Sequence, residues 1–492
     1  MGSAGNHDVR LAVSDEHGGF SDGLGAGGAG GQATAGRASG AGQLAMKDVS
    51  ARGKKSVALN LKDPAAIETL LRMGRAAARP SFTARPAEEL PLFLAQWQGV
   101  LSEPAAGEGR DPGRLETALE RLFGCPLAAE LLEGDVLPAR VPGYHTAALD
   151  ALTQQTGLMW FGCGPRRVAV GFSEHAELFR AAPEARSGTE TALFPDPRGR
   201  YAFEDLLHGS PMDSAALSEA LWRGVWEGRV ANDSFEALRR GLQTRFRPAT
   251  VHATHRPIGR RRAFDRWRAT RPFAGAWYEL PPPFDSADPL DREEANKERV
   301  RVLLDRYGVL FRELLDQEPP HIRWGALFRT LRLMELSGEV VAGQFFDGIH
   351  GPQFAAPDAF RTLQSGLAAD AIYWLNAADP ASLCGVPVTG LRAALPKRLA
   401  STHLVYQGTC LVAVSERNAA RITFHTGAEE PRLPDYLGVF EHLLARSFLP
   451  RASLRVETIN GSPAKNSPYL DAFRRRFDVA PSPGHVTLRL RT

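Results

Sequence analysis

Cysteine is scarce in this 492-residue chain, long apolar runs and an export signal are missing, and each absence excludes a class of protein. The four cysteines lie far apart and form no CxxC pair, which excludes a zinc ribbon and argues against a disulfide scaffold. No run of about 18 apolar residues occurs, so we expect no transmembrane helix and no membrane partner. The first residues lack a basic region followed by an apolar core, which argues against a secretory signal. Together these absences predict a cytoplasmic protein.

Nucleotide-binding and metal-binding motifs are missing as well. The segment Gly53-Lys54-Lys55-Ser56 lacks the upstream glycine and the residue order of a phosphate-binding GxxxxGK[ST] loop. We therefore predict that this chain has no ATPase activity. No histidines or cysteines have the spacing of metal ligands, and His350 stands alone in a segment rich in glycine and proline. The sequence thus predicts neither a metal nor a cofactor.

Lysine is the scarcest charged residue, with only seven among the 59 basic residues. The others are arginines, whose planar guanidinium can bind two phosphate oxygens at once. Seven arginines gather around Trp267 within one short segment: Arg256, Arg260, Arg261, Arg262, Arg266, Arg268 and Arg271. This arginine cluster either follows a nucleic-acid backbone, with Trp267 stacking on a base, or forms a solvated linker between domains.

Composition and periodicity divide the chain into six segments. The first is rich in glycine, with 13 glycines in 42 residues, so we expect a flexible, disordered tail. Three winged-helix-like units follow, and an arginine-rich linker precedes the third of them. The last segment alternates strands with helices and is expected to be barrel-like or α+β. The predicted fold class is therefore α+β with tandem winged helices. The boundaries are 1–60 for the tail, 61–175, 176–250 and 284–365 for the winged-helix units, 251–283 for the linker and 366–492 for the C-terminal module.

The third unit has the clearest pattern. A helix ends near Tyr307, a second covers about 310–317, and the Pro319-Pro320 pair stops it. The next helix starts near Arg323 and ends at Gly338, and its apolar stripe is expected to comprise Leu327, Leu331, Met334 and Leu336. A strand over 339–346 completes a helix–turn–helix with a β wing, which typically presents its last helix to a nucleic-acid groove. Arg323, Arg329 and Arg332 lie off the apolar stripe and are candidates for phosphate contacts. Alternatively, the winged helix only holds other domains together.

Several segments resemble one family in the same order along the chain. They include LLEGDVLPARVPGY at 131–144, ALWRGVWEGRVANDSFEALRRGL at 220–242 and MELSGEVVAGQFFDGIHGPQFAAP at 334–357. These blocks resemble the C-terminal half of the large helicase-related (Lhr) proteins, without their helicase motor. Asp347, His350 and Pro352 depart from the family pattern. The resemblance implies a DNA-binding protein of DNA repair, acting on duplex or single-stranded DNA. It also implies two further partners, a separate helicase subunit or a second copy in a homo-oligomer.

The same architecture is similar to that of AlkZ-like DNA glycosylases, which carry a Gln-x-Gln pair. This similarity implies a second candidate function, the metal-independent removal of a damaged base. Gln96-Trp97-Gln98 has the Gln-x-Gln spacing, although Trp97 at helical spacing beside Phe93 is also typical of a core residue. A glycosylase needs a carboxylate or amide that acts on the sugar. The candidates, in order, are Asp347, Gln353 and Gln98, each of which could instead be a structural polar residue.

Overall fold

The computed structural model describes residues 9–14, 54–59, 82–101, 112–181, 193–246 and 274–491. The chain divides into two compact units, Met1–Thr83 and Ala84–Thr492, and each is described by itself. In the first unit, strand β1 (Val9–Ser14) pairs antiparallel with β2 (Lys54–Leu59). The rest of the predicted glycine-rich tail lies outside the described residues.

The second compact unit begins with the first winged helix. Its three-stranded sheet has the order β3-β5-β4, in which β4 and β5 form an antiparallel hairpin. Gly157, with φ of 71°, ends helix α6 before this hairpin. The elements are η2 (Ala87–Glu89), α2 (Leu90–Trp97), α3 (Pro112–Glu120), β3 (Leu127–Ala128), α4 (Ala129–Leu131), η3 (Leu132–Val136), α5 (Leu137–Arg140), α6 (Thr146–Thr156), β4 (Met159–Gly162), β5 (Arg167–Gly171) and α7 (Ser173–Phe179).

The second region, which comprises the elements from α8 to β7, packs against the first winged helix through one continuous apolar core. This core includes Leu149 and Trp160 from the first winged helix and Leu221, Trp222 and Trp277 from the second region. Helix α9 begins after Asp213, whose side chain accepts a hydrogen bond from Ala216 N at 2.7 Å and so caps the helix. The elements are α8 (Phe203–His208), α9 (Ser214–Trp226), β6 (Val230–Asn232), α10 (Phe235–Gln243) and β7 (Trp277–Glu279).

The third winged helix confirms the predicted helix–turn–helix and wing, with shorter elements in two places. The helix expected over 310–317 is a strand followed by a four-residue helix, and the wing strand covers three residues. Its sheet has the order β8-β10-β9. The elements are α12 (Pro289–Tyr307), β8 (Val309–Leu310), α13 (Arg312–Leu315), η4 (Pro320–Ile322), α14 (Trp324–Leu336), β9 (Val341–Gly343), β10 (Gln353–Ala355) and α15 (Pro357–Ser365).

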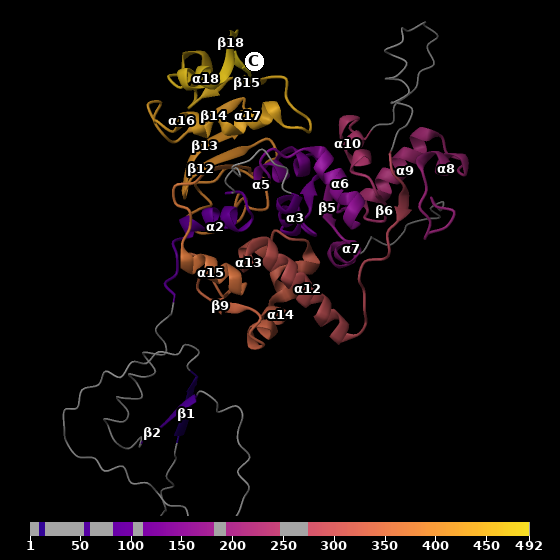
Figure 1. Ribbon diagram of the computed structural model, residues 1–492, viewed down its shortest axis with the longest axis vertical. Helices are drawn as coiled ribbons and strands as arrows, with labels where there is room; N and C mark the ends of the chain where they lie inside the picture. The colour runs from indigo at the N-terminus through magenta and orange to yellow at the C-terminus, as the bar shows by residue number, and fades with distance from the viewer. Residues whose placement is uncertain are drawn as a thin grey trace, which may run out of the picture. The chain divides into compact units, whose positions relative to one another are not determined.

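The C-terminal module is α+β, and no sheet in its described part closes into a barrel. One sheet has the order β11-β12-β13-β14-β16-β17, and the other has the order β15-β19-β18. The edge strand β17 has two exposed residues, one of them Pro463, which has no N–H to extend the ladder. The barrel-like alternative is therefore wrong. Helices α16, α17 and α18 pack beside the strands and share their core (Figure 1).

The elements of this module are β11 (Ile372–Asn376), β12 (His403–Gln407), β13 (Cys410–Glu416), β14 (Arg421–Phe424), α16 (Leu433–Tyr436), α17 (Gly438–Ala445), β15 (Leu454–Val456), β16 (Thr458–Ile459), β17 (Ser462–Pro463), η5 (Ala464–Asn466), α18 (Leu470–Arg476), β18 (Phe477–Ser482) and β19 (His485–Leu490).

Candidate nucleic-acid interface

Helix α14 of the third winged helix is the candidate recognition helix. It packs on the core through Trp324, Leu327, Leu331 and Met334, all of which are buried. Gly338 adopts φ of 79° directly after the helix, as a helix stop requires. Leu336 was expected on the buried stripe, but it is 79% exposed because it lies at the solvent end of the last turn. The pattern predicts the helix and most of its buried face.

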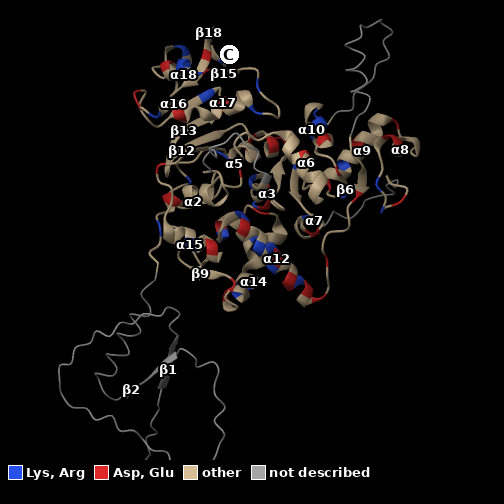
Figure 2. Ribbon diagram, in the orientation of Figure 1, with Lys and Arg blue, Asp and Glu red and all other residues tan. Residues whose placement is uncertain are grey.

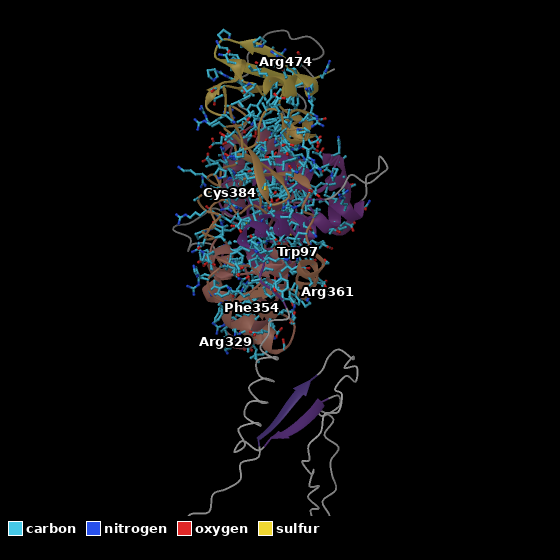
Figure 3. All side chains as sticks on the ribbon, turned by 90° about the vertical axis from the view of Figure 1, so that its left-hand side faces the viewer. Trp97, Arg329, Phe354, Arg361, Cys384 and Arg474 are labelled. Atoms are coloured by element: carbon cyan, nitrogen blue, oxygen red, sulfur yellow. The ribbon has the colours of Figure 1, made fainter. Side chains whose placement is uncertain are left out.

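The solvent face of α14 combines positive charge with apolar surface. Arg329 and Arg332 are exposed and lie three residues apart, so they share one side of the helix. Arg332 pairs with Glu335, whereas no ion pair to Arg329 occurs in the described part of the chain. Phe328 and Leu333 flank them and are 38% and 39% exposed. Figure 3 labels Arg329 together with Phe354 of the same winged helix. Of the two arginines on this face, Arg329 is therefore the one more available for a phosphate.

Arg323 does not share that face. It directly precedes α14, and its Nε donates a hydrogen bond to the carbonyl oxygen of Glu318 at 2.9 Å. The side chain lines a cavity beside Glu318 instead. The structure thus brings together two of the three arginines predicted on this helix and separates the third.

The wing holds two of the predicted catalytic residues in very different environments. Gln353 is fully buried, and its Oε1 accepts hydrogen bonds from the backbone N–H groups of Phe345 and Phe346 at 3.0 and 2.9 Å. Its Nε2 donates to the carbonyl oxygen of Phe346 at 2.7 Å. These bonds fix the wing loop, so the amide already has a structural role. Asp347 is exposed, and no ion pair to its carboxylate occurs among the described residues.

Gln98 lies apart from the wing, at the end of α2. It is 1% exposed, and its Oε1 accepts a hydrogen bond from Arg140 at 2.5 Å. Arg140 in turn forms a bidentate ion pair with Asp379, with both N–O distances at 2.8 Å. The neighbouring Trp97 donates its ring N–H to the carbonyl of Asp305 at 2.9 Å. Gln98 is therefore closed off from solvent, whereas Gln96 and Trp97 are half-buried. All three side chains are hydrogen-bonded to other parts of the fold.

The arginine cluster from Arg256 to Arg271, including Trp267, lies outside the described residues. Elsewhere, acidic and basic residues are interspersed along α12, as the red and blue segments of its ribbon show (Figure 2). That helix therefore offers no continuous positive surface. The candidate interface in the described part of the chain is the solvent face of α14 with the adjacent wing.

Sequence reasoning missed a set of buried charges in the segment 131–144. Residues 132–136 form a π-helical turn, an uncommon element that often marks a functional site. Within this segment Glu133, Asp135 and Arg140 are at most 3% exposed. The sequence did carry a sign of these buried charges, because Glu133, Asp135 and Arg140 interrupt an otherwise apolar run. The partners outside the segment could not be read from it, since they lie 42 to 311 positions away along the chain.

Two carboxylates of this segment connect different parts of the fold. Glu133 accepts hydrogen bonds from Tyr144 at 2.6 Å and from Arg239 of the second region at 2.7 Å. Asp135 lies within 3.2 Å of donors from the C-terminal module, which are His403, His442, Arg446 and Asn376. We call the Asp135 group the carboxylate hub.

Electrostatics explain why the hub carboxylate stays charged. Burial alone would raise the pKa of Asp135, but His403 and His442 outweigh it and hold the pKa well below its usual range. Burial also lowers the pKa of His442, which keeps that ring neutral near pH 7. Within the described ranges, no group of histidine, cysteine and acidic side chains could hold a metal ion. No described helix is long and apolar enough to cross a membrane.

Comparison with known proteins agrees with the fold. Models of the winged-helix domain of large helicase-related proteins match residues 86–173 and 289–374. Over these two segments the chain is similar to the large helicase-related proteins. The two matched Lhr domains correspond to the first and third winged helices, so the resemblance expected from sequence is confirmed.

Two curated Lhr relatives cover most of the chain. Lhr helicase/uracil glycosylase of Escherichia coli is 27% identical over 82% of this chain. Lhr helicase/probable uracil glycosylase of Mycolicibacterium smegmatis is 29% identical over 84% of it. The chain spans only 28% of the length of each relative. A solved structure, Streptomyces sahachiroi DNA glycosylase AlkZ, covers 75% of this chain and 98% of its own at 14% identity and a TM-score of 0.40, which is too distant to carry a conclusion.

Proposed function

We propose that this chain binds DNA through the third winged helix and acts in DNA repair. The observation that supports this proposal is the exposed arginine pair, Arg329 and Arg332, on the recognition helix of an Lhr-type winged helix. Guanidinium groups on such a helix are suited to phosphate contacts, which position the protein on DNA. A separate helicase subunit and a homo-oligomer stay predictions from the sequence.

The test measures the affinity for a duplex and a single strand as a function of salt. Each phosphate-bound arginine should contribute about −0.9 to the slope of log affinity against log salt on duplex DNA. Replacing Arg260, Arg261 and Arg262 with alanine is expected to flatten the slope by about 2–3 units if the arginine cluster follows the backbone. An unchanged slope would assign that cluster to a linker, and a lack of DNA binding by the native chain would contradict the proposal.

A second function, removal of a damaged base, is favoured by Asp347. This carboxylate is exposed on the wing of the proposed DNA-binding domain and has no ion-pair partner among the described residues. A carboxylate in that state can orient a water and stabilise the positive charge that develops on the sugar. The names of both Lhr relatives include uracil glycosylase, so uracil is the first base to test. The proposed reaction needs no metal and no ATP.

The assay follows abasic-site formation in a uracil-containing duplex under single-turnover conditions. Asp347→Asn is expected to lower the rate by about 10²–10⁴ while DNA affinity stays the same. Asp316→Asn is the matched control, because Asp316 is also exposed in the third winged helix but lies off the wing. Gln353→Ala and Gln98→Ala test the other two candidates, with unfolding curves to detect loss of their structural bonds. Full activity in all three alanine or asparagine variants would reject these residues.

A further inference from the structure

A cavity of about 510 Å³ lies where three parts of the second compact unit meet. We call it the junction cavity. The first winged helix contributes Cys125, Cys163 and Arg167, the third contributes Glu318 and Arg323, and the C-terminal module contributes Arg398. Its volume is within the range of small-ligand sites, roughly 300–1,000 Å³.

Three guanidinium groups line this cavity without a carboxylate partner in the described part of the chain. Arg167 donates to the carbonyl of Pro126 at 2.9 Å, and Arg323 donates to that of Glu318 at 2.9 Å. Arg398 donates to four backbone carbonyls, the shortest bond being 2.9 Å to Ser382. Carbonyl oxygens satisfy some N–H groups but leave the positive charge uncompensated. Each arginine therefore has charge available for an anion.

Among the described residues that line the junction cavity, the acidic side chain is that of Glu318, and it is already neutralised. Glu318 accepts hydrogen bonds from buried Arg306 at 2.7 Å and from the hydroxyl of Tyr307 at 2.7 Å. Burial, followed by the charge of Glu318, raises the pKa of Tyr307 well above its usual value, so the phenol stays protonated. The Glu318–Arg306 pair has no net charge, so the three lining arginines give the cavity an excess of positive charge.

The walls between these charges are neutral. Burial raises the pKa of Cys125, and it raises that of Cys163 to about 12, so both remain thiols near pH 7. Phe179 and Leu127 add apolar surface. A smaller cavity of about 380 Å³ beside the carboxylate hub differs, because Arg446 and Arg451 there face Asp135 and Glu130. The junction cavity thus combines apolar walls with an excess of positive charge.

We infer that the junction cavity binds a phosphate group. Planar guanidinium groups from three directions match the several oxygens of a phosphate monoester, and each charge-assisted bond is stronger than a neutral one. The phosphate belongs either to a DNA end or to a free mononucleotide. The DNA source depends on the proposed function, whereas the mononucleotide source does not.

The experiment measures binding by calorimetry with the full chain. The probes are inorganic phosphate, thymidine monophosphate, thymidine, and one duplex with either a 5′-phosphate or a 5′-hydroxyl end. Arg323→Gln and Arg167→Gln are expected to weaken binding of the phosphate-bearing probes by about 10–100-fold, because each removes charged hydrogen bonds. Arg361→Gln is the control, since Arg361 is an exposed arginine of the same winged helix that pairs with Asp358. Thermal unfolding of each variant verifies the fold.

The inference is supported, with a free nucleotide as the source of the phosphate, if the native chain binds the mononucleotide but not thymidine and both cavity variants lose this binding. A preference for the 5′-phosphate duplex, lost in the same variants, supports it with a DNA end as source. The inference is overturned if no phosphate-bearing probe binds more tightly than its phosphate-free counterpart. It is also overturned if the folded cavity variants bind these probes as tightly as the native chain does. The 5′-hydroxyl duplex separates the two proposals, because its binding tests the proposed function alone.

Discussion

The first and third winged helices have the same fold but expose different surfaces. In the first, the turn of the β4–β5 hairpin is bonded to the second region, since Gly164 N donates to the carbonyl of Trp226 at 3.0 Å. Its helix α6 is also held there, because Asp150 pairs with Arg239 at 2.8 Å. In the third, Arg329 on α14 and Asp347 on the wing are exposed and have no ion-pair partner within the described ranges.

This difference indicates that winged helices serve two purposes in one chain. The first is an internal scaffold, because its hairpin, its helix and the carboxylate hub all contact other parts of the fold. The third keeps its recognition helix open to a ligand. Substitutions at the contacts between the first winged helix and its neighbours should therefore affect stability, whereas substitutions on α14 should affect DNA binding.

The largest effect is expected at the carboxylate hub. Asp135→Ala leaves the largely buried Arg446 without its carboxylate, so the free energy of unfolding should fall by about 3–5 kcal/mol. Urea unfolding measures this loss. The control is Asp358→Ala in the third winged helix, whose carboxylate pairs with Arg361 in solvent. It should change stability by less than about 1 kcal/mol. Equal effects of the two substitutions would contradict a scaffold role for the hub.

A smaller effect on stability is expected from glycine substitutions in the hairpins of the first and third winged helices, because the two hairpins have different surroundings. In Gly162→Ala the added methyl would lie 1.8 Å from the carbonyl oxygen of Val225, a backbone atom that cannot move alone. The free energy of unfolding should fall by about 1–3 kcal/mol or more. In Gly343→Ala, on the wing of the third winged helix, the nearest atom is in the ring of Phe345 at 3.4 Å. That variant should unfold at nearly the native denaturant concentration, and a larger loss there than at Gly162 would reverse the comparison.

The smallest effect is on the salt dependence of DNA binding. The double substitution Arg329→Gln and Arg332→Gln should flatten the slope of log affinity against log salt by about 1–2 units, because up to two phosphate contacts are lost. Arg223→Gln on α9 is the control, an exposed arginine that pairs with Glu219 at 3.4 Å. A native slope in the double variant would remove α14 from the interface.

The sequence predicted local features better than long-range ones. The apolar period and Gly338 predicted helix α14, because each depends on residues within a few turns. Burial of Gln98 and Gln353 was not predictable, since an amide side chain has no periodic signature. Gln98 is buried because Arg140 and Asp379 come together across 239 positions. The open sheet of the C-terminal module pairs strands that are close along the chain, but whether it closes into a barrel depends on its edge strands β11 and β17, which composition does not encode.

Hydrogen exchange with and without duplex DNA tests most directly whether the third winged helix, and not the first, contacts DNA. We predict slower amide exchange on DNA binding in α14 and in the wing from β9 to β10. The turn between β4 and β5 should exchange at the same rate in both states, because its Gly164 N–H is already bonded to Trp226 of the second region. Protection of that turn with no change in α14 would contradict the assignment of scaffold and interface.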